Sequence, residues 1–400
     1  MNKIMTVNIM RDDLAEYPNY LGAEISLPAT GFELKDALDR ARVSNGHTYT
    51  ITYCDWNEDV LDSFALKNIS LDELNFFAKR ILDLDAYALM LFDGCVKMEA
   101  KPVEIKKLIN LTYDLDECQA AISVKNDREL GEFYSENGFI EELEGIPEKV
   151  WEYLDYEKIG KARREAEKGV YVEGGYVVND KLDFKEVYDG IHLPGHTKES
   201  NFVFKVYISK AHNADEPTDD KGLWLSFPTT ETEIANTLKE LGANSINDCV
   251  FYEYISAIPQ LNESFITLED MEKLNILAKR IEEIEKQGVM AKYKAVLEYT
   301  QMNTLDQALD LGNNLDCYNI YAEMTMSEDY GKHILQQESK LKSDDVAFFL
   351  FNFRSYGSAK MEENKIRRTE YGLVGRNDKE FVFEYLSKPN EEQAIGSIQI

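Results

Sequence analysis

The sequence predicts an α+β protein with an elongated shape, in which two tandem repeats each consist of several small sheet-plus-helix lobes. Three observations support this prediction. The chain has 400 residues, which is too long for one ordinary hydrophobic core. One set of residues recurs at a constant spacing along the chain. Short strand patterns alternate with short helical patterns, without the repeated crossover units of a parallel sheet.

The internal repeat is the clearest feature of the sequence. Leu74–Ile81 and Leu274–Ile281 are identical at six of eight positions, at an offset of 200. The same offset aligns Ser26, Pro28, Thr30, Glu33, Leu38, Leu111, Leu115, Asp116 and Gly131 with Ser226, Pro228, Thr230, Glu233, Leu238, Leu311, Leu315, Asp316 and Gly331. Shared helix composition gives local likeness without a constant register. The sequence therefore indicates a tandem duplication.

Domain boundaries follow from this repeat. Near the end of each copy the offset falls to 197, where Gly160 faces Gly357 and Gly175 faces Gly372. We expect a first repeat over 1–180, a linker over 181–199 and a second repeat over 200–378. Gly and Pro between Asp189 and Thr197 are typical of a linker or exposed turn. Residues 379–400 are expected to form a tail or an added strand, because aromatic residues alternate there.

The elements of each repeat are predicted in the following order. An alternating strand containing Val7 and Ile9, or Val203 to Ile208, precedes a proline turn and a helix from about residue 32 or 232. A second strand follows over Thr48–Cys54 and Cys249–Tyr254, which are rich in β-branched and aromatic residues.

Helix starts are marked by capping patterns. Ser70 and Glu73 have the spacing of a capping box, with Thr267 and Asp270 as the counterpart, and positions 74, 77, 78 and 81 form the predicted buried face. Pro102 is predicted to open the next helix. Asn126 is expected to cap a helix that buries Leu130 and Phe133, and Pro147 to begin a helical stretch carrying Trp151 and Leu154.

The composition of the chain limits the classes of function that it can have. The formal net charge is −30, from 74 acidic and 44 basic residues, so the chain should repel nucleic acid. A 44% hydrophobic content supplies enough core material for folding. The five scattered cysteines are expected to be reduced thiols of a cytoplasmic protein. The N-terminus lacks a secretory pattern, and the longest apolar run, Val346–Phe351, is too short for a membrane span.

No strong enzyme or cofactor motif is present, so we predict no catalytic, cofactor-binding or metal-binding residue and no cofactor. His192 and His196 form the only close histidine pair, but Pro194 disfavours a helix that would align them, and a linker is the better interpretation. Tryptophans 56, 151 and 224 could stack on bases. They lie among acidic residues, which favours packing in a core or interface instead.

Acidic residues concentrate in the first repeat. Residues 114–154 contain twelve acidic and three basic residues, whereas the equivalent residues 314–354 contain seven and four. A solvated helical face would explain such a run, but a net charge of −30 favours a functional surface. The predicted partner-binding carboxylates are Asp114, Asp116, Glu117, Asp127, Glu129, Glu132, Glu136, Glu141, Glu142, Glu144, Glu148, Glu152, Asp155 and Glu157.

The chain resembles antirestriction proteins of the ArdA type, which are acidic DNA mimics carried by plasmids, conjugative elements and phages. The segments that carry the resemblance are Gly222–Pro228, Tyr252–Tyr254, Ile69–Asn75, Leu111–Asp116 and Asn126–Tyr134. The resemblance implies a non-enzymatic, cofactor-free protein of several lobes. Such a protein occupies the basic DNA-binding groove of type I restriction-modification enzymes, with carboxylates in the place of phosphates.

Two alternative functions remain open, and the sequence differs from the typical family member in one respect. The same charge logic fits an inhibitor of another nucleic-acid-directed defence complex, such as a CRISPR effector. An acidic interaction module unrelated to DNA mimicry would instead bind through aromatic residues, independently of salt. Members of the family typically have one unit and look like dimers, whereas this chain has two. We therefore hypothesise either a monomer that acts as a pseudo-dimer, with the second repeat as scaffold, or a homodimer.

Overall fold

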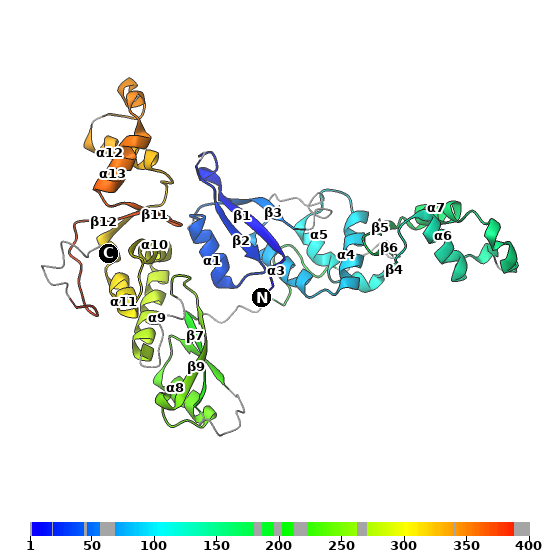
Figure 1. The fold of residues 1–400 in the computed structure, drawn as a ribbon, viewed down its shortest axis with the longest axis horizontal. Helices are drawn as coiled ribbons and strands as arrows, with labels where there is room; N and C mark the ends of the chain where they lie inside the picture. The colour runs from blue at the N-terminus through cyan, green and yellow to red at the C-terminus, as the bar shows by residue number, and fades with distance from the viewer. Residues whose placement is uncertain are drawn as a thin grey trace. The chain divides into compact units, whose positions relative to one another are not determined.

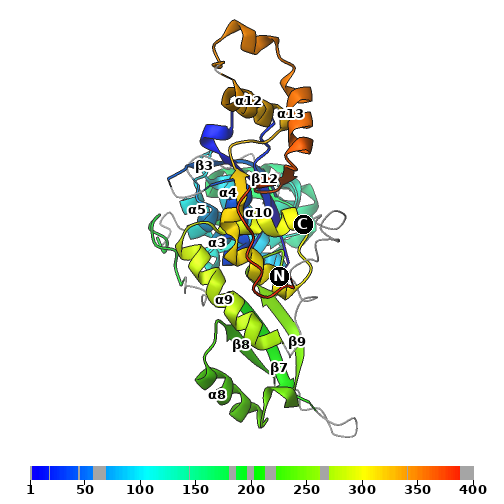
Figure 2. The same cartoon turned by 90° about the vertical axis from the view of Figure 1, so that its left-hand side faces the viewer.

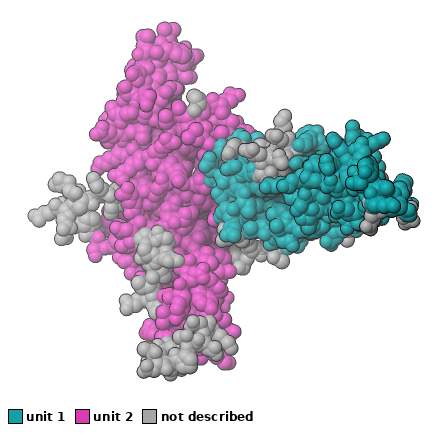
Figure 3. All heavy atoms as spheres, turned by 45° about the vertical axis from the view of Figure 1, so that its right-hand side comes forward, with its two compact units in different colours: residues 1–9, 24–30, 50–197 teal, residues 10–23, 31–49, 198–400 magenta. Residues whose placement is uncertain are grey.

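The computed structural model describes residues 2–17, 19–43, 46–56, 69–143, 145–179, 186–195, 202–211, 222–261, 270–339 and 341–387. The chain forms two compact units (Figure 3). Unit 1 contains residues 1–9, 24–30 and 50–197, and unit 2 contains residues 10–23, 31–49 and 198–400. Two N-terminal segments thus belong to the unit that contains the second half of the chain.

The two halves carry the same elements in the same order (Figure 1). The first half has β1 (Met5–Arg11), β2 (Ala23–Leu27), α1 (Gly31–Arg40), β3 (Tyr49–Asp55), α3 (Leu71–Leu82), α4 (Ala86–Met98), α5 (Ile105–Leu111), β4 (Cys118–Ile122), α6 (Asp127–Glu136), α7 (Tyr156–Glu167), β5 (Val170–Val172) and β6 (Gly175–Asn179). The second half has β7 (Phe204–Lys210), β8 (Leu223–Phe227), α8 (Glu231–Leu241), β9 (Cys249–Ser256), α9 (Met271–Lys286), α10 (Met290–Thr300), α11 (Leu305–Asn313), β10 (Tyr318–Tyr321), α12 (Ser327–Glu338), α13 (Phe353–Glu363), β11 (Arg367–Thr369) and β12 (Gly372–Arg376). Short 3-10 helices include η3 (Glu141–Leu143) and η4 (Glu148–Tyr153) between α6 and α7, and η9 (Val346–Leu350) between α12 and α13.

Each half builds two small three-stranded sheets. The strand orders are β2-β1-β3 and β4-β6-β5 in the first half, and β8-β7-β9 and β10-β12-β11 in the second. The pairs of β7 with β8 and β9 are antiparallel, as are all pairs of the β4 and β10 sheets. The predicted α+β class with several small sheet-plus-helix lobes is therefore confirmed.

Local sequence signals explain where α3 begins. Ser70 Oγ accepts a hydrogen bond from the Glu73 backbone N–H at 3.1 Å, and Glu73 Oε2 accepts one from the Ser70 N–H at 3.0 Å. This is the predicted capping box, which satisfies donors that the first helical turn leaves unpaired. The predicted apolar face of α3 is buried at all four positions. The counterpart at Thr267 lies outside the described residues.

Two side-chain contacts recur at the offset of 200. The Asn75 side chain donates to the Ala29 carbonyl at 2.9 Å and accepts from its N–H at 2.6 Å. Asn275 makes the same pair of bonds with Thr229, at 2.9 and 2.8 Å. Arg80 donates to the Thr112 carbonyl at 2.9 Å, and Arg280 donates to the Gly312 carbonyl at 2.9 Å. The residues matched in sequence therefore hold equivalent parts of the backbone.

The cores lie where the helices of each half meet the sheets. In unit 1, Phe77 of α3 and Phe92 of α4 are fully buried, with ring centroids 5.9 Å apart. In unit 2 one continuous cluster joins β7 and β8 to α9, α10 and α11 and reaches Val374 of β12. Figure 2 shows α9 beside the strands of the β7 sheet.

Of two helix starts predicted at prolines, one differs from the structure and one agrees with it. Pro102 lies before α5, whose first residue is Ile105 and whose N-cap is Glu104. The turn at Pro102 is followed by the isolated bridge residue Val103, and the helix starts only after it. The helical stretch predicted to begin at Pro147 is the 3-10 helix η4, which carries Trp151 and has Leu154 as its C-cap. The longer helix α7 begins at Tyr156.

The segments that follow each half are held by residues at equivalent positions, Asn110 and Asp310. Of the two forms expected for the C-terminal segment, a tail or an added strand, the described residues 378–387 contain no strand. Instead, Asp310 Oδ1 accepts hydrogen bonds from the backbone N–H groups of Glu384 and Tyr385 at 3.0 and 3.1 Å. Asn110 Oδ1 likewise accepts from Val187 and Tyr188, both at 2.8 Å. Tyr188 is only 2% exposed, so this part of the expected linker is packed within unit 1.

Candidate functional site: the carboxylates of the α6–α7 lobe

The α6–α7 lobe consists of the β4-β6-β5 sheet, the helices α6 and α7, and the 3-10 helices between them. Asn126 caps α6 as predicted, because its Oδ1 accepts a hydrogen bond from the Glu129 N–H at 2.9 Å. The Glu129 carboxylate accepts from the Lys125 N–H and from the Asn126 side chain, both at 2.7 Å. Glu129 is thus part of the helix start.

Two glycines allow α6 and α7 to cross closely. A Cβ atom added to Gly131 would collide with the Tyr156 carbonyl, and one added to Gly160 would collide with the Asp127 carbonyl. Gly331 and Gly357 are in the same situation between α12 and α13. The aligned glycines of the two halves are therefore helix-crossing points, and they fix the positions of the side chains on both helices.

Asp127 lies inside this crossing. Its carboxylate accepts two hydrogen bonds from Arg164 of α7, at 2.7 and 3.0 Å, and one from the Tyr171 hydroxyl at 2.8 Å. The bonds from Arg164 lower the pKa of Asp127 below its ordinary value. The charge of Asp127 is therefore neutralised within the lobe and is not offered to a partner.

A second internal carboxylate, Glu167, was not among the predicted residues. It accepts hydrogen bonds from the Tyr134 hydroxyl at 2.9 Å and from the Tyr176 hydroxyl at 3.1 Å. Burial and the charge of Glu167 raise the pKa of Tyr176. No local sequence pattern predicts this contact, because Tyr134 and Glu167 are 33 residues apart.

The fourteen predicted carboxylates fall into three groups. The exposed ones are Asp116, Glu117, Glu136, Glu141, Glu142, Glu152, Asp155 and Glu157. The half-buried ones are Asp114, Asp127, Glu129 and Glu132. Glu144 lies outside the described residues, and so does the side chain of Glu148. The first group presents its charge to solvent.

Some exposed carboxylates also have partners within the lobe. Asp155 caps α7 by accepting from the Lys158 N–H at 3.1 Å. Glu142, whose side chain is 80% exposed, lies 3.8 Å from Arg163. An ion pair of that length at the surface contributes little. Glu141, Glu142 and Glu152 therefore remain the best candidates for contact with a positively charged partner.

Basic residues beyond the predicted window reduce the charge of the lobe. Residues 118–179 carry fourteen acidic and eight basic side chains. Five of the basic residues follow Glu157, four in α7 and one directly after it: Lys158, Lys161, Arg163, Arg164 and Lys168. Arg164 forms an ion pair with Asp127, so these two charges balance each other. The remaining acidic charge of the lobe lies mainly around η3, η4 and the start of α7.

The matching lobe of unit 2 has a different surface. Residues 318–376 carry nine acidic and nine basic side chains. At η9, Val346, Phe349 and Leu350 are 80%, 74% and 82% exposed, and Phe351 is 41% exposed. At the offset of 197, Phe349 stands where the first half has Glu152. At this one position the second lobe presents an exposed aromatic side chain where the first presents an exposed acid. Val346, Phe349, Leu350 and Phe351 are called the η9 patch below.

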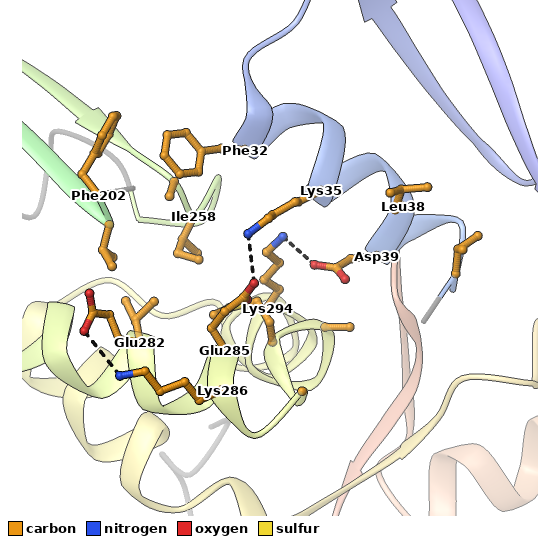
Figure 4. Close-up of a pocket in the computed structure, with 17 residues that line it drawn as sticks. Phe32, Lys35, Leu38, Asp39, Phe202, Ile258, Glu282, Glu285, Lys286 and Lys294 are labelled. Carbon is orange, nitrogen blue, oxygen red and sulfur yellow. Dashed lines mark hydrogen bonds and ion pairs between the residues drawn. The ribbon is translucent and has the colours of Figure 1, made fainter. Parts of the chain in front are cut away.

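Unit 2 also contains a pocket of about 550 Å³ between α1, α9 and α10 (Figure 4). Phe32, Leu38 and Ile258 are among its apolar lining residues. The charged groups at its wall pair with one another, as Lys35 does with Glu285 at 3.0 Å and Lys294 with Asp39 at 2.8 Å. The pocket therefore lacks the convergent polar groups that would orient a ligand.

Metal and membrane sites receive no support within the described ranges. There, no cluster of three or more His, Cys, Asp or Glu side chains is placed to hold a metal ion. His192 pairs with Asp189 at 2.9 Å at the surface, and His196 lies outside the described residues. No described helix combines the length and the apolar character that a membrane span requires.

The aromatic residues are divided between core and surface. Trp56 packs edge-on against Phe77 at 5.3 Å, in agreement with the predicted packing role. Trp224 is 39% exposed on β8 and lies 5.3 Å from Tyr207. Trp56 belongs to unit 1 and Trp224 to unit 2.

Comparison with protein families gives one match. Residues 219–375 match the family model of the antirestriction protein ArdA. The match runs from just before β8 to the penultimate residue of β12, and thus covers most of the second half. No curated protein matches the chain. Residues 219–375 are therefore similar to the ArdA antirestriction family, in agreement with the resemblance noted in the sequence.

Proposed function

We propose that this chain is a non-enzymatic, acidic DNA mimic that inhibits type I restriction-modification enzymes by occupying their DNA-binding groove. The observation that carries the proposal is the ArdA domain at residues 219–375, since that family is antirestrictive. The net charge of −30 and the exposed carboxylates of the α6–α7 lobe supply the mechanism. No turnover and no cofactor enter the proposal.

The geometry of the α6–α7 lobe supports mimicry of a phosphate array. B-DNA presents about one negative charge per 1.7 Å of its axis, and basic grooves bind it with release of counterions. The exposed carboxylates lie on short helices whose crossing is fixed by Gly131 and Gly160. A rigid scaffold lowers the entropic cost of binding. We therefore assign the first contact with the groove to Glu141, Glu142 and Glu152.

We further infer that residues 1–180 are a second ArdA-type copy and that the chain arose by tandem duplication. The supporting facts are the identical element order, the identical strand orders and the recurring contacts of Asn75 and Asn275. Because the two halves differ in charge, we assign them different roles. The first copy binds the basic groove, and the second serves as scaffold.

The η9 patch favours the homodimer over the monomeric pseudo-dimer. Two chains that each carry a charge of −30 repel one another over most of their surfaces. Residues 318–376 carry no formal net charge, and their exposed side chains at η9 are large and apolar. Such a patch is typical of a protein interface. We propose that two copies associate through it, with the α6–α7 lobes left accessible.

An inhibition assay tests the proposed function. Purified full-length chain is titrated into a type I restriction-modification enzyme, and DNA cleavage and methylation are measured at two salt concentrations. We expect inhibition that excess DNA relieves and that weakens at the higher salt concentration. Lack of inhibition would reject the type I target, and inhibition of an RNA-guided nuclease in its place would establish the alternative defence complex. Salt-independent binding would reject mimicry.

Neutralising the exposed acids tests the assigned surface. Replacing Glu141, Glu142 and Glu152 by Gln should weaken inhibition by roughly tenfold, because electrostatic complementarity across the groove is lost. The matched control replaces Glu240, Glu253 and Glu362, three exposed acids of the second half, by Gln. The same loss in both variants would show that total charge, and not this lobe, determines binding.

A further inference from the structure

Two cysteines of unit 1 lie in contact although they are far apart in sequence. Cys95 belongs to α4 and Cys118 is the first residue of β4, and their Sγ atoms are 2.7 Å apart. A covalent S–S bond measures about 2.05 Å. The two side chains are 2% and 7% exposed and need only a small approach to become bonded. The remaining cysteines, Cys54, Cys249 and Cys317, are also buried.

The fold itself does not require this thiol pair. At the offset of 200, Cys95 corresponds to Ala295 of α10 and Cys118 to Tyr318 of β10. Ala295 is fully buried and Tyr318 is 1% exposed, so the second half buries residues without a thiol at the equivalent positions. The thiol pair is therefore specific to the half whose lobe carries the exposed acids.

We propose that Cys95 and Cys118 form a reversible disulfide when the chain meets a low-molecular-weight disulfide such as oxidised glutathione. One protein thiolate attacks a sulfur of the reagent, forms a mixed disulfide and releases one glutathione thiolate. The second protein thiolate then attacks the protein sulfur of the mixed disulfide and releases the second glutathione. The two protein thiols are oxidised, the reagent is reduced to two thiols, and the protons pass to the released glutathione.

The bond would fasten the α6–α7 lobe to the rest of unit 1. β4 is an edge strand of the lobe's sheet, and α4 packs against that sheet next to Cys95, where Gly94 contacts Val177 of β6. A disulfide there closes the chain between residues 95 and 118 and restricts the unfolded state. Oxidation thus stabilises the junction that positions the acidic surface. This inference does not depend on the proposed function.

The environment of the pair determines its reactivity. The hydrogen bond with Cys118 and burial raise the pKa of the Cys95 thiol above its ordinary value. Since the thiolate is the attacking species, the bond should form slowly at neutral pH and faster as the pH rises. Charged groups near Cys95 are Glu99 on its own helix and Lys107 of α5. Once formed, the bond is protected by its burial.

The experiment is a thiol count on the full chain. The native protein is incubated with mixtures of oxidised and reduced glutathione, quenched in acid, denatured and alkylated. We expect two of the five thiols to be lost together, and a digest to contain a peptide cross-linked between Cys95 and Cys118. The thermal midpoint of unfolding should rise by roughly 5 °C in the oxidised chain.

Two variants serve as controls. Cys95→Ala copies the residue of the second half, so it should fold, keep four alkylatable thiols and show no rise of the midpoint on oxidation. Cys249→Ala with Cys317→Ala should still form the bond. Five alkylated thiols in the oxidised wild-type chain would overturn the proposal. So would stable attachment of glutathione without the cross-linked peptide, or cross-linking between chains.

Discussion

Asp127 shows how one carboxylate can serve the fold instead of the surface. It accepts two hydrogen bonds from Arg164 and one from Tyr171, and its side chain is 19% exposed. Charge-assisted bonds of this kind contribute more than neutral ones. Asp127→Asn should lower the free energy of unfolding by about 1–3 kcal/mol at neutral pH. Urea unfolding followed by tryptophan fluorescence would measure the change.

The same variant makes a prediction about pH. Because the pKa of Asp127 is lowered in the folded chain, its contribution is complete above about pH 4, the pKa of an unfolded aspartate, and is lost as the pH falls through the folded value. The difference between wild type and Asp127→Asn should therefore shrink under acidic conditions. Glu136→Gln, at an exposed position, should change little at either pH. A difference that persists in acid would contradict the role of this ion pair.

The residue scale also shows what the sequence could not reveal. The acidic segment, residues 114–154, could be recognised from the sequence because the charge of a segment is the sum of the charges of its residues. The division of those acids into exposed and internal ones depends on partners that lie far away in sequence, such as Arg164, which is 37 residues from Asp127. The cap at Asn126 was predicted from a local pattern, and Glu129, which was predicted as a partner-binding carboxylate, takes part in the same helix start. Glu167 gave no such signal.

Among the elements, the crossing of α6 and α7 depends on Gly160. Replacing a helical glycine by alanine ordinarily stabilises a helix by about 1 kcal/mol. At Gly160 the added Cβ meets the Asp127 carbonyl, which is backbone and has little freedom to move. Gly160→Ala should therefore destabilise the lobe, by about 2–3 kcal/mol. Hydrogen exchange of the α6 and α7 amides would report the loss.

A control in the same helix separates propensity from packing. Ala166 of α7 is exposed, so Ala166→Gly should cost only the propensity difference of about 1 kcal/mol. If Gly160→Ala stabilised the lobe, the close crossing would be disproved. Gly357→Ala should behave like Gly160→Ala, because its added Cβ would collide with the Ser327 carbonyl.

A buried cation joins α1 to α10 within unit 2. Lys294 is 2% exposed, and its Nζ lies 2.9 Å from Asp36 and 2.8 Å from Asp39. Burial raises the pKa of Asp39. Lys294, Tyr371 and Arg40 together outweigh burial at Asp36 and lower its pKa. The first half has Gly94 at the position of Lys294, so this cluster has no counterpart there.

Removing the cation should be costly. Lys294→Met leaves the carboxylates of Asp36 and Asp39 without the lysine and should destabilise unit 2 by about 3–5 kcal/mol. Urea unfolding would measure this loss. Adding Asp39→Asn to that variant should recover part of the loss, because the unpaired charge is removed. Lys35→Met breaks only the exposed pair with Glu285 and should cost less than about 1 kcal/mol. Equal losses in the two single variants would refute the role of burial.

At the scale of the whole molecule, the likeness of the two halves could be predicted and the packing of their parts could not. Identities at offsets of 200 and 197 align the halves, and in the described residues twelve pairs of helices and strands follow the same order. The assignment of residues 31–49 to unit 2 depends on Lys294, Asp36 and Tyr371, which no periodicity connects. The packing of Tyr188 depends equally on a distant residue, Asn110.

The η9 patch yields the prediction about assembly. Exposed Phe349 and Leu350 correspond, at the offset of 197, to Glu152 and Tyr153 of the first half. The double variant Phe349→Glu with Leu350→Tyr therefore carries residues that the equivalent lobe already accommodates. It introduces a charge into the apolar interface of each copy, which two-fold symmetry would place close to its counterpart. We expect the wild-type chain to sediment as a dimer and the variant as a monomer, with unchanged thermal stability.

The control for assembly lies in the first half. Tyr153 is 80% exposed at the equivalent position of the α6–α7 lobe, and Tyr153→Glu should leave the mass in solution unchanged. A wild-type chain that sediments as a monomer at all concentrations would exclude the dimer and favour the pseudo-dimer. If the double variant becomes monomeric but inhibits a type I enzyme as strongly as before, one chain suffices for inhibition. A loss of inhibition in proportion to the loss of dimer would show that two α6–α7 lobes must act together.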